Sequence, residues 1–322
     1  MPPRWSPIDL TRRAALAGIA AALPAIAFAQ SPLPATRNAL VPFDVSPFPY
    51  RGIAPKTGKP FLDVEQGERR GRNTARGGVL WEDATYSDRR VLLSIPRGFD
   101  LRKPSMIVVF FHGNGATLSR DVRNRQQVPR QIVESGLNAV LVAPQFAFDA
   151  ADSSAGRFWE PGVFAQFMDE AASRLARLHG DARAQAVFER APIVIAAYSG
   201  GYHPLAFVLS VGGATERVRG ALLLDALYGD HDKYLDWLAR KPEAFFVSTY
   251  GALVKPQNEE FRKQLTDRGI GFTTSFPPHL VPGINAFLDV GEEVKHNDFV
   301  TQAWSADPLK VMLSRVPGYA RR

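Results

Sequence analysis

Short apolar runs alternate with helical patterns from about residue 77 onward, and this alternation constrains the fold more than any other feature of the sequence. Several runs are apolar without a break, which is typical of strands buried on both faces of a sheet. The alternation predicts an α/β fold with a mostly parallel central sheet of about eight strands flanked by helices. Strands are expected at 79–86, 90–95 (these two as an antiparallel pair), 105–111, 138–143, 192–197, 218–224, 244–249 and 272–276, and helices at 122–135, 164–178, 204–211, 233–240, 259–268 and 308–315.

The N-terminus is typical of an export signal. Arg12 and Arg13 precede an apolar stretch, residues 14–29, that is too short to span a bilayer. The stretch ends in a small-x-small pattern that signal peptidase accepts, so cleavage after Ala29 is expected. The paired arginines resemble the bacterial twin-arginine signal, with Ala15 in place of the usual Phe. We therefore expect a periplasmic or secreted protein with no stable membrane insertion after the signal is removed.

Composition limits the remaining possibilities. Cysteine is absent, which excludes disulfides, thiolate zinc sites and a cysteine nucleophile. The formal charge of +7 is spread along the chain, and no nucleic-acid-binding motif is present, so nucleic acid is not an expected partner. The densest basic stretch, at 67–76, is predicted to be a solvated loop. The expected organisation is a signal peptide at 1–29, an extended arm rich in Pro, Gly and Arg at 30–76, and an α/β domain at 77–322.

A serine follows one of the expected buried strands at a tight turn. Ser199 lies between small residues, in Ala-Tyr-Ser-Gly-Gly, and a helical pattern comes directly after it. Strained backbone at such a turn exposes the hydroxyl, and the helix N-terminus directs free N–H groups at an oxyanion. The segment resembles the nucleophile elbow of the α/β-hydrolase superfamily, with Ala197 in place of the more usual Gly. The alternative is a helix-capping serine in a glycine-rich turn.

A second segment carries the same resemblance. His112-Gly113-Asn114-Gly115 follows the expected strand 105–111 and is similar to the loop that lends a backbone N–H to the oxyanion hole in this superfamily. The resemblance implies that Asn114 or Gly115, together with Gly200, donates these N–H groups. It also implies that His112 is structural rather than a base.

The superfamily order of nucleophile, acid and late histidine implies the other two members of a triad. His296 fits best among the six histidines, and His279 is the reserve. The usual acid position, a loop after the seventh strand at 248–252, offers no carboxylate. Asp225 ends an apolar strand, where a buried charge needs a partner, and some lipases of the superfamily carry their acid there. The open alternatives are Asp230, Asp232 and Asp298.

These residues predict an exported serine hydrolase that cleaves a carboxylic ester of a small molecule through an acyl-enzyme, with no metal and no organic cofactor. Asp230, His231 and Asp232 are predicted to form a solvated turn rather than a metal site. The aromatic segment 146–161 is expected either to line the pocket, which favours an apolar acyl group, or to pack on the core. An amidase or peptidase on the same scaffold, and a binding protein that has lost catalysis, remain the alternatives.

Overall fold

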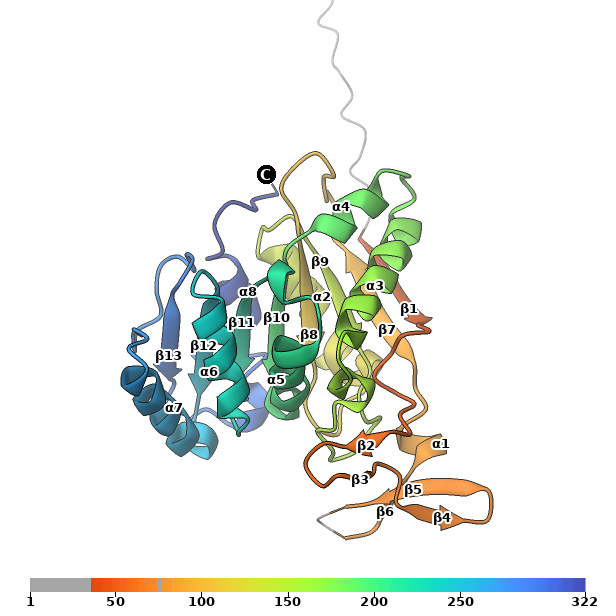
Figure 1. The fold of residues 1–322 in the computed structure, drawn as a ribbon. Coiled ribbons are helices and arrows are strands. Elements are labelled where there is room, and N and C mark those ends of the chain that lie inside the picture. The colour runs from red at the N-terminus through yellow and green to blue at the C-terminus, as the bar shows by residue number, and fades with distance from the viewer. Residues whose placement is uncertain (1–35, 75–76, 322) are drawn as a thin grey trace, which may run out of the picture. The chain divides into compact units, whose positions relative to one another are not determined.

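The computed structural model describes residues 36–74 and 77–321, and an eight-stranded sheet is its central layer (Figure 1). The expected export signal lies outside the described residues. All neighbours from β9 to β13 are parallel, while β7 runs antiparallel to both β1 and β9. This confirms the predicted α/β fold. In spatial order the strands are β1 (Arg37–Pro42), β7 (Arg90–Ile95), β9 (Ala139–Pro144), β8 (Met106–Phe111), β10 (Ile193–Tyr198), β11 (Val218–Leu224), β12 (Phe245–Tyr250) and β13 (Asn285–Asp289).

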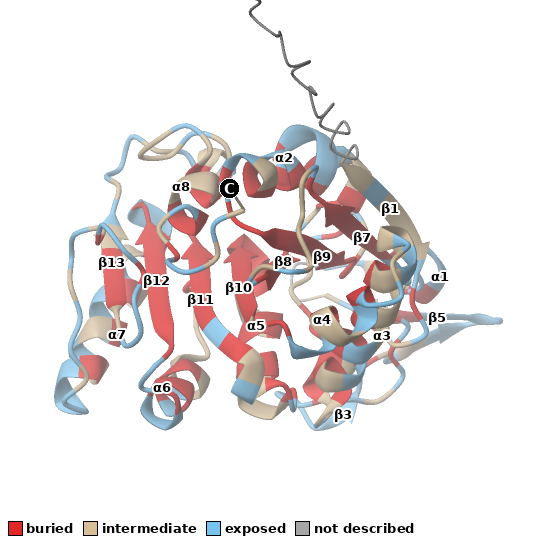
Figure 2. Ribbon diagram, turned by 90° about the horizontal axis from the view of Figure 1, so that it is seen from above, coloured by how far each residue is buried: buried red, intermediate tan, exposed pale blue. Residues whose placement is uncertain are grey.

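Helices cover both faces of the sheet, because the central strands are apolar on both sides. Figure 2 shows these strands buried between the two helical layers. One face packs against α2 (Val128–Glu134) and α8 (Pro308–Leu313). The other packs against α3 (Val163–His179), α4 (Ala184–Arg190), α5 (Tyr202–Val211), α6 (His231–Arg240) and α7 (Lys255–Asp267).

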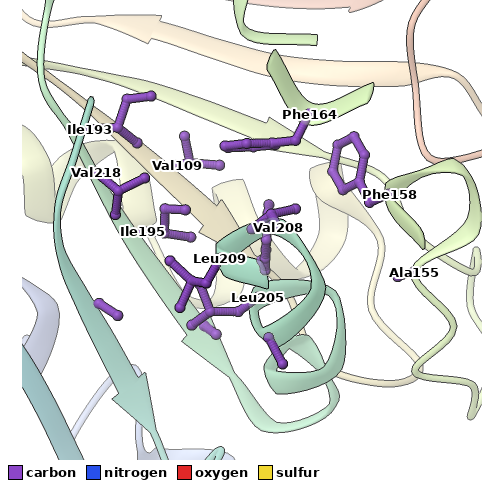
Figure 3. Close-up of a cluster of buried hydrophobic side chains, with 14 of the residues drawn as sticks. Val109, Ala155, Phe158, Phe164, Ile193, Ile195, Leu205, Val208, Leu209 and Val218 are labelled. Carbon is purple, nitrogen blue, oxygen red and sulfur yellow. The ribbon is translucent and has the colours of Figure 1, made fainter. Parts of the chain in front are cut away.

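Alternate residues of one strand supply the two cores, as the pleat of a strand requires. In β8, Ile107 and Val109 belong to the core under α5, while Val108 and Phe110 belong to the core under α2 and α8. Figure 3 shows the first of these cores, in which strand and helix side chains interdigitate. Its labelled members include Val109, Ile193, Ile195, Val218, Leu205, Val208 and Leu209. The core fixes α5, and therefore the turn that precedes it, against the sheet.

The N-terminal part of the described chain differs from the expected arm. β1 pairs with β7 along its whole length and is an edge strand of the main sheet. After it come the hairpin of β2 (Ile53–Ala54) and β3 (Lys59–Pro60) and a small sheet of β4 (Val64–Gln66), β5 (Arg69–Asn73) and β6 (Val79–Trp81). The expected pairing of 79–86 with 90–95 is wrong, because β6 pairs with β5 and is followed by the short helix α1 (Glu82–Thr85).

Two expectations in the later part of the chain also need correction. The last strand is β13, not 272–276, where Thr273 forms only an isolated bridge with Ala286. The expected helix at 122–135 is divided into a π-helix, η1 (Leu118–Arg125), and α2. The other predicted strands and helices are present with slightly shifted ends. Within the described ranges, no helix has both the length and the apolar character needed to cross a membrane.

Candidate active site

Ser199 begins a tight turn at the carboxyl end of β10. The short 3-10 segment η3 (Ser199–Gly201) connects the strand directly to α5. The φ of Ser199 is 52°, a left-handed conformation that costs a non-glycine residue about 1–3 kcal/mol. The turn also packs closely against the end of β8, since a Cβ on Gly201 would lie 2.5 Å from the Phe111 carbonyl oxygen. The sequence therefore places a hydroxyl on a strained bend at the carboxyl end of β10.

His296 and Asp225 meet this hydroxyl from two other loops at the same edge of the sheet. The Ser199 hydroxyl donates to Nε2 of His296 at 2.7 Å. Nδ1–H of His296 donates to Oδ2 of Asp225 at 2.5 Å, because an ionised carboxylate only accepts hydrogen bonds. Asp225 is 1% exposed, and its second oxygen accepts the Gly251 N–H at 3.0 Å. The three predicted residues therefore form one continuous hydrogen-bonded chain.

The alternative residues lie elsewhere. Asp230 accepts a hydrogen bond from Nδ1 of His203 at 2.6 Å, which occupies both groups. Asp232 is exposed and pairs with Lys233. Asp298 and His279 have no recorded contact with the Ser199–His296 pair among the described residues.

Tyr198 supports His296, and sequence reasoning missed this. The two rings stack at 5.1 Å between centroids with an interplanar angle of 26°. The Tyr198 hydroxyl also donates to the backbone carbonyl of His296 at 3.0 Å. A tyrosine inside the serine turn was the available signal, but only the folded structure brings it to the histidine loop, which lies 98 residues later.

The loop after β8 approaches the serine closely, and His112 fixes it. Nδ1–H of His112 donates to the Gly113 carbonyl at 2.8 Å, and Nε2 accepts the Phe146 N–H at 2.9 Å. Burial lowers the pKa of His112 to about 4, so the ring is neutral at ordinary pH. Gly113 is required there, because a Cβ would lie 2.8 Å from the Ser199 Cβ. His112 is thus a structural clamp, as the resemblance implied.

Two of the three expected N–H donors, Gly200 and Asn114, lie next to each other beside Ser199. Gly200 lies in the first turn of the helical segment, where N–H groups lack intrahelical partners. A Cβ on Gly200 would lie 2.2 Å from Oδ1 of Asn114, so these two residues are in contact. No acceptor in the described part of the chain takes the Asn114 N–H. The Gly115 N–H, in contrast, donates to the Ala150 carbonyl at 2.7 Å, which leaves Asn114 as the partner of Gly200.

A cavity of about 430 Å³ opens at Ser199. Tyrosines, small polar side chains and one arginine line it. Burial and the charge of Asp225 raise the pKa of Tyr228 to about 12, against the effect of a hydrogen bond with Ser199 that lowers it. The lining residues are Asn114, Arg125, Ser153, Tyr198, Ser199, Gly200, Tyr202, Tyr228, His296 and Asn297.

Ser153 of the segment 146–161 lines this cavity, but the aromatic side chains of the segment do not. Phe146, Phe158 and Trp159 are buried in the core on the α5 side of the sheet. Trp159 also donates its indole N–H to Nε2 of His203 at 3.0 Å. Of the two expectations for this segment, packing on the core is therefore correct.

A larger cavity lies away from Ser199. It has a volume of about 840 Å³ and is lined by residues at the amino ends of β12 and β13, including Ala244 and Asn285. None of the candidate catalytic residues lines it. Nowhere in residues 36–74 and 77–321 do three or more His, Asp or Glu side chains gather as a metal ion would require. The ring of His231 packs against Phe261.

In the described part of the basic stretch, residues 67–74, the arginines are held by carboxylates or by a hydroxyl. Arg69 binds Asp83 at 2.8 Å, and Arg70 lies 3.5 Å from Glu65. Arg72 donates to the Ser154 hydroxyl at 2.6 Å. These pairs are mostly exposed, as expected, but the predicted loop is wrong, because Arg69–Asn73 form strand β5.

No protein-family model and no curated protein sequence matches the chain. Several solved structures resemble it at low identity. A mutant of the feruloyl esterase module from Clostridium thermocellum is 14% identical, with 88% of this chain and 96% of that chain covered and a TM-score of 0.44. A ferulic acid esterase is 11% identical, with coverages of 87% and 99% and a TM-score of 0.46. An S-formylglutathione hydrolase from Agrobacterium tumefaciens is 14% identical, with coverages of 74% and 94% and a TM-score of 0.42.

Proposed function

We propose that this protein is an exported serine hydrolase that cleaves carboxylic esters, with Ser199 as nucleophile, His296 as general base and Asp225 as the acid that orients the imidazole. The observation that carries the proposal is the pair of hydrogen bonds that links the three side chains, 2.7 Å and 2.5 Å long. The strained serine backbone and the adjacent glycines support it, since both expose the hydroxyl to a substrate. Export rests on the signal pattern of residues 1–29.

The proposed reaction follows from which atoms donate and which accept in these two hydrogen bonds. Nε2 of His296 takes the proton of Ser199 while Oγ bonds to the ester carbonyl carbon. The N–H groups of Asn114 and Gly200 stabilise the resulting oxyanion. Nε2–H then protonates the leaving alkoxide, which departs as the alcohol and leaves an acyl-enzyme. A water molecule loses its proton to Nε2, attacks the acyl carbon and releases the acid, and Ser199 regains its proton.

A fluorophosphonate probe and two substrates test this proposal. The mature wild-type protein is expected to be labelled on Ser199 and to hydrolyse p-nitrophenyl butyrate. In Ser199→Ala both are lost, with turnover falling at least about 10³-fold. Ser210→Ala, at the far end of α5, the helix that follows the Ser199 turn, is the matched control and should retain both. Labelling that persists in Ser199→Ala, or a wild type that is neither labelled nor active, contradicts the proposal, and faster turnover of aminoacyl anilides would identify an amidase instead.

A further inference from the structure

One side of the cavity at Ser199 carries a positive charge. Arg125 is its only Lys or Arg, and no Asp or Glu is among the described residues that line it. The guanidinium also affects Tyr198, since its charge opposes the rise in the Tyr198 pKa that burial causes. Tyr198 in turn stacks on His296. The charge of Arg125 therefore lies beside the wall of the cavity that holds the proposed base.

The guanidinium of Arg125 is held in place but still has free donors. Its Nε–H donates to Oδ1 of Asp121 at 3.0 Å. Within the described ranges of the chain, no acceptor is recorded for its two Nη groups. Neighbouring Arg120 differs, because it donates to Asp121, Asp149 and the Gly115 carbonyl. A guanidinium has five N–H donors in a planar fork, so Arg125 keeps the pair of parallel donors that a carboxylate prefers.

Asp121 holds Arg125 in this orientation. It is 5% exposed and accepts the Thr117 N–H at 2.8 Å. Although burial raises its pKa, the Thr117 amide and the two arginines hold the pKa of Asp121 below its usual range. The carboxylate therefore stays ionised, and the guanidinium that it holds does not need to be ordered when a ligand binds.

The backbone that presents Arg125 is unusual. Arg125 is the last residue of η1, an eight-residue π-helix that begins at Leu118. π-Helical turns are rare, and they occur frequently at functional sites. Arg125, at the C-terminal end of this π-helix, lines the cavity. This observation is independent of the charge and of the hydrogen bonds.

The rest of the cavity also suits a polar substrate. Asn114, Ser153 and Asn297 contribute amide and hydroxyl groups, and Tyr202 and Tyr228 contribute phenols. No Val, Leu, Ile or Met is among the described residues that line it. A long alkyl chain would therefore find no aliphatic surface there, whereas a short, charged group finds donors on several sides.

We propose that Arg125 binds a carboxylate of the substrate, so that the ester cleaved at Ser199 carries an acidic group on its acyl part or on its alcohol part. This inference rests on the proposed hydrolase activity and names its substrate class. The carboxylate forms two parallel hydrogen bonds with the Nη groups while the ester carbonyl faces Asn114 and Gly200. The contact binds substrate rather than reacting atoms, so Arg125 sets specificity.

Two pairs of esters that differ in one carboxylate test this inference. Monoethyl adipate is compared with ethyl hexanoate for an acid on the acyl side, and 3-carboxyphenyl butyrate with phenyl butyrate for an acid on the alcohol side. For at least one pair, kcat/KM of the wild type should favour the acidic ester by about tenfold, as expected for a charge-assisted contact at a half-exposed site. Arg125→Met should abolish that preference, and the loss should appear in KM for the acidic ester rather than in kcat.

Three further measurements make the outcome decisive. Arg125→Lys keeps the charge without the fork and should retain part of the preference, while Arg123→Met, on the same π-helix but outside this cavity, should retain all of it. A wild type that cleaves neutral esters without preferring either acidic one overturns the inference and leaves the hydrolase proposal intact. If no ester is cleaved, calorimetry with Ser199→Ala still decides, because binding of monoethyl adipate must weaken about tenfold on adding Arg125→Met. Equal binding overturns the inference.

Discussion

The buried ring of His112 makes the stability of this protein depend on pH, and replacing it with glutamine tests how. His112 is 3% exposed, and its Nε2 faces the Phe146 N–H and the side-chain amide of Gln145. A proton on Nε2 would point at these donors, so protonation requires the clamp on the loop of Asn114 to open. Glutamine fills a similar space and offers hydrogen bonds, but it does not titrate.

The expected magnitude follows from the pKa of His112, which burial lowers from 6.5 to about 4. A tenfold change in a proton-binding constant corresponds to about 1.4 kcal/mol, so the full effect of His112 on the free energy of unfolding is about 3 kcal/mol. The unfolded chain takes up this proton more readily than the folded chain. The contribution of His112 is therefore fully present above about pH 6.5 and is lost as the pH falls from there to about 4. Between pH 7 and pH 5 the loss is about 2 kcal/mol.

Urea unfolding followed by tryptophan fluorescence measures this loss at several pH values between 7 and 5. His112→Gln should be less stable than the wild type at pH 7 because of imperfect packing, by about 1–3 kcal/mol. Its disadvantage should shrink by about 2 kcal/mol at pH 5, since it lacks the titrating group. His279→Gln, at an exposed position, should leave the pH dependence unchanged. A difference between wild type and His112→Gln that is the same at both pH values refutes the reasoning.

Three substitutions in the site have separate expected outcomes. Asp225→Asn should lower kcat/KM about 10³- to 10⁴-fold, because an amide does not fix the His296 tautomer, with unchanged circular dichroism; a loss below tenfold contradicts the assignment. Gly113→Ala puts a Cβ 2.8 Å from the Cβ of Ser199 and should slow fluorophosphonate labelling at least about tenfold. Labelling at the wild-type rate would show that the loop moves to make room for the methyl group. Tyr228→Phe keeps the ring but removes a phenol that lines the cavity with Ser199, and kcat should fall about tenfold at constant KM; an unchanged kcat removes the phenol from the reaction.

The part of the fold that the sequence predicts is the part whose signal is local. An unbroken apolar run such as β8 reports burial on both faces, whatever surrounds it. The Ser199 turn and the loop after β8 are equally local, because small residues are required wherever two backbones approach within a Cβ's reach. Asp225 was found by a physical conflict between its charge and the apolar strand before it, and this conflict is also visible within a few residues.

The features that the sequence did not predict depend on distant partners. β1 is only half-buried and contains Arg, Asn and Pro, and its strand character comes from its pairing with β7. β13 has only five residues, and its last two, which are half-exposed and exposed, weaken the apolar pattern. In the sequence, Arg125 cannot be told from other basic residues of a helix. Only the structure shows that it ends a π-helix and lines the cavity at Ser199. In each case the feature depends on a contact with a distant part of the chain rather than on a periodic pattern in the local sequence.

The position of the proposed acid shows how such contacts decide which carboxylate meets His296. After β12, where the resemblance places the acid, the chain has Gly251, whose N–H donates to Oδ1 of Asp225. A Cβ at Gly251 would meet the Phe299 ring at 3.3 Å, so a carboxylate there would need the ring to move. Asp225 reaches His296 from the neighbouring strand instead, with a φ of 46° that aspartate tolerates better than most residues. The end of β11 thus supplies the carboxylate that meets His296, and the end of β12 supplies the N–H that orients this carboxylate.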